Sequence, residues 1–251
     1  MWDTPLNIPV EQIPEDYRFT TDRQYYSQAQ TVIFHLPTLI NELENDLEKP
    51  EGQIWVAWTL ECEENYPFFK DPEFTELFDY RISYHQTADV IQSYLHDNFI
   101  PLMKQPVDTK ERANNICMLI SSPINQSSRQ EYLKELMREI PIDSYGKLFN
   151  NKKMDQDNGR ESKINLYKQY KFVIAFENAC ATDYVTEKFF DPLIAGAVPI
   201  YLGAPNINEF APGEHCFIHA NDFKSPKELA DYIEECYNNE QEYQSFFQWK
   251  Q

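Results

Sequence analysis

The apolar positions of this chain form short runs separated by helical stripes. Residues 172–176 and 198–202 are continuous apolar runs rich in β-branched and aromatic residues, which predicts two buried strands. Between the runs, four apolar residues recur at helical spacing: Val185, Phe189, Leu193 and Ile194. The predicted helix ends at Gly196, so the segment is expected to form a βαβ unit with parallel strands.

The rest of the chain repeats this alternation. Strands are predicted over residues 31–35, 54–59, 79–84 and 116–120, and helices over residues 36–47 and 129–140. Residues 100–115 carry Pro101, Pro106 and mixed charge without periodicity, and are interpreted as an interdomain linker. The pattern predicts two α/β domains, over residues 1–112 and 113–251.

Polar residues gather where the strand over residues 172–176 ends. Glu177 and Asn178 follow it directly. Tyr184, Glu187 and Lys188 are spaced i, i+3 and i+4, which would place them on one face of the first helical turn. In parallel sheets, ligands bind beyond the carboxyl ends of the strands, so this edge is the candidate site.

The predicted helix start has the chemistry of an anion site. Thr182 or Asp183 can cap the helix, whose free N–H groups and dipole attract anions. Lys188 adds a full positive charge that suits a diphosphate, and Glu187 can accept hydrogen bonds from ribose or sugar hydroxyls. The competing interpretation is a solvated helix start with one Glu/Lys pair.

Charge and cysteine content narrow the function classes. A net charge of −19 argues against sequence-independent nucleic-acid binding. One basic segment beside the candidate anion site fits a phosphate-bearing small ligand, or else a solvated loop; its members are Lys147, Lys152, Lys153, Arg160, Lys163, Lys168 and Lys171. Five single cysteines without a C-x-x-C pair indicate reduced thiols and no structural zinc site.

Targeting signals are also absent from the printed sequence. It contains no apolar run near the roughly 20 residues of a membrane span, and its start lacks the basic and apolar regions of a secretory signal. A cytoplasmic location is therefore predicted.

Residues 176–205, FENACATDYVTEKFFDPLIAGAVPIYLGAP, resemble the donor-binding motif of the α-1,3/α-1,4-fucosyltransferases, glycosyltransferase family 10. The resemblance is long and ungapped and extends over most of the chain. It implies a GT-B type fold with two Rossmann-like domains facing a cleft. The first domain would bind an acceptor oligosaccharide and the second GDP-fucose, without a metal or other cofactor.

The resemblance also assigns residue roles. Transfer would be inverting, from GDP-fucose to O3 or O4 of an N-acetylglucosamine-type glycan. Such a reaction needs a base for the acceptor hydroxyl. The alignment places that base at Glu61, which follows the strand over residues 54–59, with Glu63 as the competitor. From the residues alone, an acidic turn in solvent is the favoured interpretation of this segment, and only the resemblance favours Glu61 as a base.

The donor side of the resemblance names six residues. The segment SSRQEY matches the family around an arginine that contacts the diphosphate, here Arg129, at an otherwise unfavourable position near a helix start. The remaining donor-binding candidates are Glu177, Asn178, Tyr184, Glu187 and Lys188. The family continues beyond Trp249, which implies a truncated C-terminus and allows peripheral membrane contact through segments outside this chain.

Two other function classes stay open on the sequence. A glycosidase could use two carboxylates such as Glu61 and Glu177. A non-catalytic nucleotide-sugar-binding protein would bind GDP without turnover.

Overall fold

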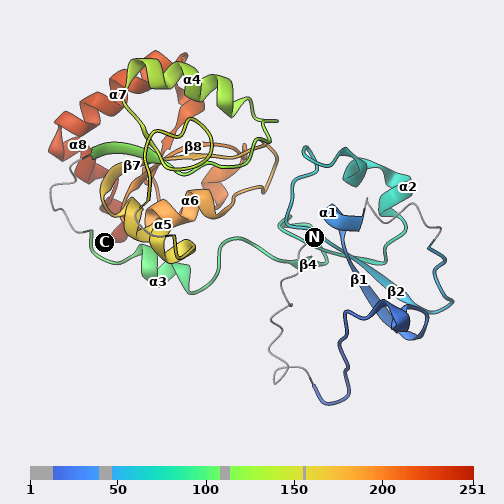
Figure 1. Ribbon diagram of the computed structural model, residues 1–251. Helices are drawn as coiled ribbons and strands as arrows, with labels where there is room; N and C mark the ends of the chain where they lie inside the picture. The colour runs from blue at the N-terminus through green and yellow to red at the C-terminus, as the bar shows by residue number, and fades with distance from the viewer. Residues whose placement is uncertain (1–13, 40–46, 108–113, 155–156) are drawn as a thin grey trace.

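The computed structural model describes residues 14–39, 47–107, 114–154 and 157–251, which form two lobes (Figure 1). Each lobe is built on its own parallel sheet. Blue and cyan segments make the smaller lobe, and green to red segments make the larger one.

The first sheet has four parallel strands in the order β1-β2-β3-β4. Its strands are β1 (Thr31–His35), β2 (Ile54–Trp58), β3 (Tyr80–Ser83) and β4 (Val90–Ile91). Its helical segments are η2 (Arg23–Gln28), α1 (Leu36–Leu39), η3 (Pro67–Lys70) and α2 (Pro72–Thr75). The three strands predicted here are confirmed, and residues 40–46 of the helix predicted over 36–47 lie outside the described residues.

One face of this sheet carries an aromatic core. Phe34 and Trp55 lie with ring centroids 4.9 Å apart, and Phe78 from the segment after α2 meets Phe34 edge-on at 5.7 Å. The segments η3 and α2 therefore cover the sheet with rings rather than with a long helix.

The second sheet has five parallel strands in the order β6-β5-β7-β8-β9. They are β5 (Asn114–Met118), β6 (Asp143–Ser144), β7 (Tyr170–Phe176), β8 (Val198–Leu202) and β9 (Ile218–His219). The predicted βαβ unit is confirmed, since β7 and β8 pair in parallel with Phe172 opposite Val198. The order reverses direction between β5 and β7, the kind of position where open α/β sheets bind ligands.

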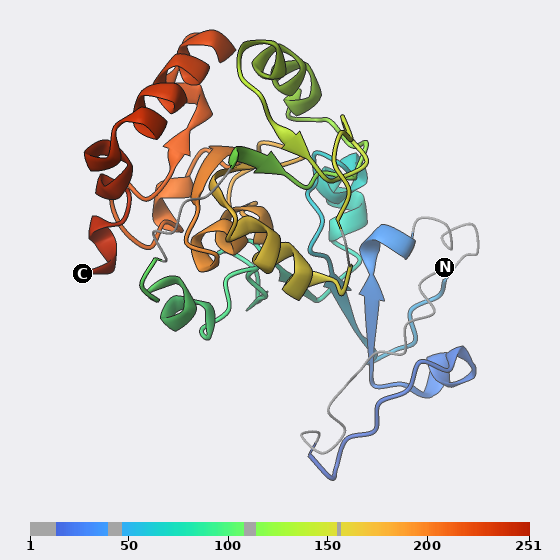
Figure 2. The same ribbon diagram turned by 60° about the vertical axis from the view of Figure 1, so that its left-hand side comes forward.

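Helices cover both faces of the second sheet (Figures 1 and 2). On one face, α4 (Arg129–Glu139), α7 (Pro226–Asn238) and α8 (Glu240–Ser245) pack on Phe172, Ile174 and Phe176. On the other, α3 (Phe99–Met103), α5 (Arg160–Tyr167) and α6 (Glu187–Ile194) pack on Val173 and Ala175. Short turns η4 (Ile207–Glu209), η5 (Ala220–Asp222) and η6 (Gln248–Lys250) complete this lobe. Burial on both faces explains why the central strands β7 and β8 are nearly continuous apolar runs.

Part of the predicted linker is instead a helix of the second lobe. Phe99 and Met103 of α3 are buried in the same cluster as Phe189 and Phe190 of α6. Pro101 is tolerated because it stands in the first turn, where its missing N–H has no intrahelical partner to lose. Over the described ranges, every helix is too short or too polar to serve as a membrane span.

Candidate functional site

Two loops meet at the carboxyl edge of the second sheet, where its strand order reverses. They are residues 121–128 after β5 and residues 177–186 after β7, called here the switch-point loops. The Ser127 hydroxyl donates to the Glu177 carbonyl at 2.6 Å, and the Ser127 N–H donates to the Asn178 carbonyl at 3.0 Å. The loops therefore form one continuous edge.

A buried charged cluster joins the second loop to α6. The Glu177 side chain is fully buried, and its Oε1 accepts hydrogen bonds from the Thr186 N–H and hydroxyl, each at 2.8 Å. Lys188 Nζ lies 3.2 Å from the other Glu177 oxygen and 3.5 Å from Glu187 Oε1. Burial opposes the Lys188 charge, but attraction to the two carboxylates raises its pKa, so Lys188 stays a cation.

Thr186 is the cap of α6. Its side chain accepts a hydrogen bond from the Lys188 N–H, and its backbone is extended (φ −99°, ψ −176°). The prediction of Thr182 or Asp183 as cap is therefore wrong. The hydroxyl also donates to Glu177, so one side chain satisfies both the helix end and the buried carboxylate.

Tyr184 does not share a helical face with Glu187 and Lys188, contrary to the spacing argument. The extended backbone at Thr186 starts the helix at Glu187 and leaves Tyr184 in the loop. Its buried ring lies 5.1 Å from that of Tyr84 and 6.4 Å from that of Tyr94, both of which precede α3 in the chain. Tyr184 thus fills the junction between the lobes.

Arg129 is fully buried behind the switch-point loops. Its guanidinium donates to the Phe176 and Ser122 carbonyls at 3.0 Å each and to the Ile124 carbonyl at 3.1 Å. Asn178 is similarly engaged, because its Oδ1 accepts from Asn65 Nδ2 at 3.0 Å. Both side chains hold the loops in place, and their predicted donor contacts stay predictions.

Part of the basic segment is paired with acidic groups. Arg160 Nη2 lies 2.7 Å and Lys163 Nζ 2.6 Å from the fully buried Asp191 carboxylate. Lys171 pairs with Glu240 at 3.3 Å. These contacts show that part of the segment neutralises α6 and α8 instead of facing a ligand.

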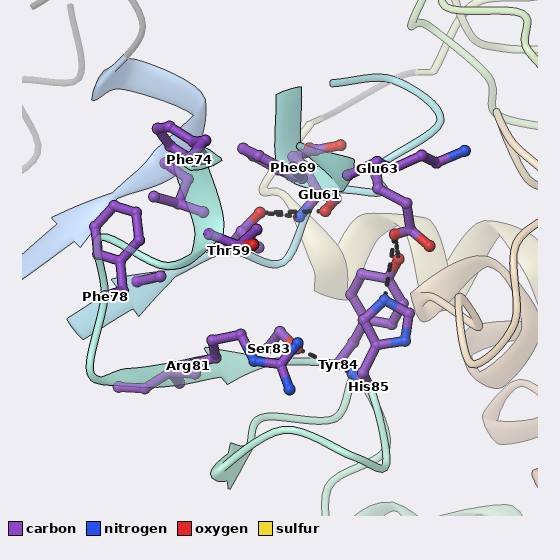
Figure 3. Close-up of a pocket in the computed structure, with 15 residues that line it drawn as sticks. Thr59, Glu61, Glu63, Phe69, Phe74, Phe78, Arg81, Ser83, Tyr84 and His85 are labelled. Atoms are coloured by element: carbon purple, nitrogen blue, oxygen red, sulfur yellow. Dashed lines mark hydrogen bonds and ion pairs between the residues drawn. The ribbon is translucent and has the colours of Figure 1, made fainter. Parts of the chain in front are cut away.

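A hollow of about 240 Å³ opens in the first lobe, at the carboxyl ends of β2 and β3 (Figure 3). One end is apolar, with the rings of Phe74 and Phe78. The other end is polar, and its lining includes Glu61, Glu63, Ser83 and His85.

Glu61 is placed by a tight turn after β2. Its N–H donates to Thr59 Oγ1 at 3.0 Å, and that hydroxyl donates back to the Glu61 carbonyl at 3.1 Å. Among the described residues, its Oε2 is buried without a hydrogen-bond partner. A carboxylate oxygen left in this condition is ready to accept a proton-bearing group.

Glu63 stands in a different environment. The Tyr84 hydroxyl donates to its Oε2 at 2.5 Å, and His85 Nε2 lies 3.2 Å from the same oxygen (Figure 3). Burial raises the pKa of Glu63, but the hydrogen bonds from His85 and Tyr84 outweigh it and lower the pKa to about 2. A carboxylate stabilised in its charged form is a poor proton acceptor.

His85 and Gln86 carry the contact to the second lobe. His85 Nδ1 lies 3.4 Å from Asp183 Oδ2, and the Gln86 N–H donates to the same oxygen at 3.0 Å. Asn206 Nδ2 donates to the other Asp183 oxygen at 2.9 Å. Sequence reasoning missed this junction, because Gln86 and Asp183 are 97 positions apart and carry no local pattern.

Cys180 is exposed at the middle of the second switch-point loop, and the other four cysteines are buried. Desolvation by its surroundings raises the pKa of the Cys180 thiol, with a smaller contribution from Glu177. The thiol is therefore mostly protonated at neutral pH, unlike an activated nucleophile.

Comparison with known proteins agrees with this architecture. Residues 109–251 match the model described as glycosyltransferase family 10 (fucosyltransferase), C-terminal, and residues 10–95 match the model of a fucosyltransferase N-terminal region. A crystal structure of an α1,3-fucosyltransferase with GDP-fucose superposes with a TM-score of 0.59 at 22% identity, covering 80% of this chain and 67% of that one. The predicted α/β fold of GT-B type is confirmed.

The names of similar proteins describe fucosyltransferases with different acceptors. The chain is 30% identical to α-(1,3)-fucosyltransferase B of Drosophila melanogaster, over 93% of this chain and 56% of the relative. It is 35% identical to GDP-fucose protein O-fucosyltransferase 3 of Gallus gallus, over 100% and 57%. It is 31% identical to 4-galactosyl-N-acetylglucosaminide 3-α-L-fucosyltransferase 9 of Mus musculus, over 92% and 63%.

The chain thus spans little more than half the length of the first two relatives and somewhat more of the third. The family model for the second lobe alone covers more than half of the 251 residues and includes every strand of the sheet that carries the switch-point loops. The chain belongs to glycosyltransferase family 10, the fucosyltransferase family.

Proposed function

We propose that this protein is an inverting fucosyltransferase. It would move L-fucose from GDP-fucose to O3 or O4 of an N-acetylglucosamine-type acceptor glycan. The observation that carries the proposal is Glu61: a buried carboxylate oxygen without a partner among the described residues, in the lining of a hollow at the strand ends of the first lobe. A base that removes the acceptor proton during attack requires such an oxygen.

The donor side supplies charge for the leaving group. Lys188 and the N-terminal turn of α6 would stabilise the negative charge that grows on GDP as the fucosyl bond breaks. Glu187, whose side chain is 38% exposed, would accept hydrogen bonds from sugar or ribose hydroxyls. Under this proposal the protein's own cations meet the diphosphate, so transfer should persist in EDTA.

Glu177, Asn178, Tyr184 and Arg129 would act by shaping the loops. These four residues are at most 7% exposed. Nη1 and Nη2 of Arg129 already donate to three backbone carbonyls, and among the described residues its buried Nε has no hydrogen-bond partner, so the side chain is mainly engaged in holding the loops. The full burial of Glu177 also argues against the two-carboxylate glycosidase, which needs both carboxyl groups at the glycosidic bond.

A polypeptide hydroxyl is the second candidate acceptor. Relatives named protein O-fucosyltransferase 3 match the whole chain, for example at 35% identity in Gallus gallus. The apolar end of the hollow, with Phe74 and Phe78, would suit an apolar side chain beside the reacting hydroxyl.

The test combines binding with transfer. Calorimetric titration should show clearly tighter binding of GDP and GDP-fucose than of UDP or CMP, and equal affinities would refute the proposal. Labelled GDP-fucose should then be offered with an N-acetyllactosamine glycan and with a folded polypeptide. Label on the glycan supports the first acceptor, label on the polypeptide the second, and GDP binding without transfer supports a non-catalytic binder.

A further inference from the structure

His85 is enclosed by charges from both lobes. Glu63, from the loop after β2, lies 3.2 Å from its Nε2, and Asp183, from the loop after β7, lies 3.4 Å from its Nδ1. The ring of Tyr84 lies beside it with centroids 4.3 Å apart. The side chains of Glu63 and Asp183 are only 22% and 7% exposed, so solvent screens these contacts incompletely.

Both ring nitrogens can serve as donors only in the protonated imidazolium. With a carboxylate on each side, the protonated ring completes a row of alternating charges, negative, positive and negative. The two carboxylates belong to different lobes, so the row spans the junction.

We infer that His85 is a positioning residue: as a cation between Glu63 and Asp183, it holds the loop after β7 against the wall of the hollow that contains Glu61. The inference rests on the proposed function only in naming that loop as part of the donor site. Through this link, the arrangement of the acceptor hollow and that of the donor loop become one structural unit.

The backbone conformation of Asp183 explains why its contact with His85 should affect the whole loop after β7. Asp183 has φ of 67°, a left-handed conformation that is uncommon for non-glycine residues but that aspartate tolerates, and its carboxylate is held there by His85, Gln86 and Asn206. Three residues later, Thr186 caps α6 and binds Glu177. Release of the Asp183 carboxylate would therefore loosen the loop up to the start of that helix.

The protonation of His85 determines in which direction the strength of the link should change with pH. The Glu63 hydrogen bond and the nearby carboxylates raise the pKa of His85, whereas the pKa values of Glu63 and Asp183 are lowered, so both carboxylates stay charged. A group whose folded-state pKa is raised stabilises fully below its unfolded pKa and loses that effect as pH rises through the folded value. The hold on the loop should be strongest in mild acid and fade in alkali.

Gln86 offers a matched control because it also joins Asp183 from the first lobe, without charge. Its Nε2 donates to Asp183 Oδ1 at 3.0 Å. If simple tethering at this junction is enough, then Gln86→Ala and His85→Gln should behave alike at every pH.

The experiment is hydrogen–deuterium exchange of peptides covering residues 177–186, in wild type, His85→Gln and Gln86→Ala, from about pH 6 to about pH 9. The intrinsic exchange rate of these peptides is the same in all three proteins, so rate ratios report the loop alone. We expect His85→Gln to speed exchange roughly 1.5- to 5-fold near pH 6, the range for a partly exposed charged link, and the ratio to approach one in alkali. For Gln86→Ala the ratio should not change with pH.

Peptides from β8 provide the folding control, because they should exchange at the wild-type rate in both variants. A ratio for His85→Gln that is constant with pH, or equal to one throughout, overturns the inference. If β8 also exchanges faster, Glu63→Gln and Asp183→Asn replace the histidine variant: each should show the same fading ratio, and their effects should combine less than additively. Additive effects overturn the inference.

GDP titration on the same samples separates the two proposals. Weaker GDP binding by His85→Gln near pH 6, with convergence in alkali, supports the link and the donor site together. A pH-dependent exchange ratio in a protein that does not bind GDP supports the link and refutes the proposed function.

Discussion

Glu61 and Glu63 stand two positions apart after the same strand, yet only Glu61 has a buried carboxylate oxygen without a partner in the described part of the chain. The Glu63 oxygen is bound by Tyr84 and His85. This difference separates two carboxylates that the sequence alone left as competitors for the role of base.

Replacing Glu61 should abolish transfer without affecting donor binding. We expect Glu61→Gln and Glu61→Ala to reduce the transfer rate by about 10²- to 10⁴-fold, because neither side chain can take the acceptor proton. The GDP affinity should stay near the wild-type value, since Glu61 lies in the lobe opposite the switch-point loops. Steady-state kinetics and calorimetry measure the two quantities.

Glu63→Gln is the control for this prediction. Its effect on transfer should be much smaller and should arise through the junction with Asp183. If Glu63→Gln is inactive and Glu61→Gln is active, the assignment of the base is reversed.

Lys188 should be needed for both stability and GDP binding, and the two roles can be separated. Lys188→Met leaves the buried Glu177 carboxylate without its cation, which should lower the free energy of unfolding by about 3–5 kcal/mol. The double variant with Glu177→Gln should regain most of this stability but not the lost GDP affinity. Denaturant unfolding and titration test this, and recovery of both would limit Lys188 to a structural role.

Arg129 should prove structural. Arg129→Ala removes the donor from three backbone carbonyls, so the free energy of unfolding should fall by about 3 kcal/mol. Arg129→Lys should not rescue it, because an ammonium cannot reproduce the planar fork.

The affinity for guanosine, which has no phosphates, distinguishes a structural role of Arg129 from direct contact with the diphosphate. If Arg129 only braces the loops, the variant should lose affinity for guanosine and GDP alike. Unchanged stability with a loss confined to GDP would instead establish direct contact with the phosphates.

The Thr186 hydroxyl can be tested with nearly isosteric substitutions. Thr186→Val keeps the shape but loses the helix cap and the hydrogen bond to Glu177, and should lower the free energy of unfolding by about 1–2 kcal/mol. Thr186→Ser keeps the hydroxyl and should retain most of the stability. Equal losses in the two variants would show that the methyl packing, not the hydroxyl, matters.

Strands such as β2, β7 and β8 were predictable from sequence because each is a short apolar run with buried residues, whereas the two-residue strands β4 and β6 carry no such run and were not predicted. Phe172 and Val198 even mark the register of β7 against β8. Helix boundaries were less so: Thr186 and Asp183 are both acceptable caps by residue type, and only the backbone conformation in the folded chain distinguishes them.

The junction between the lobes was not predictable. His85 and Asp183 carry ordinary polar side chains in segments without periodicity, and a single sequence holds no signal that pairs them. The burial of Arg129 was equally hidden, because arginine is rarely buried and its partners are backbone carbonyls, which leave no mark on residue type.

The exposure of Cys180 provides a natural attachment site for a fluorescent label. A thiol-reactive fluorophore should attach to it in preference to the four buried cysteines. Since the pKa of this thiol is raised, labelling would run best above neutral pH. The dye would then sit in the middle of the loop between Glu177 and Thr186, where its emission could follow nucleotide occupancy in real time without any substitution in the chain.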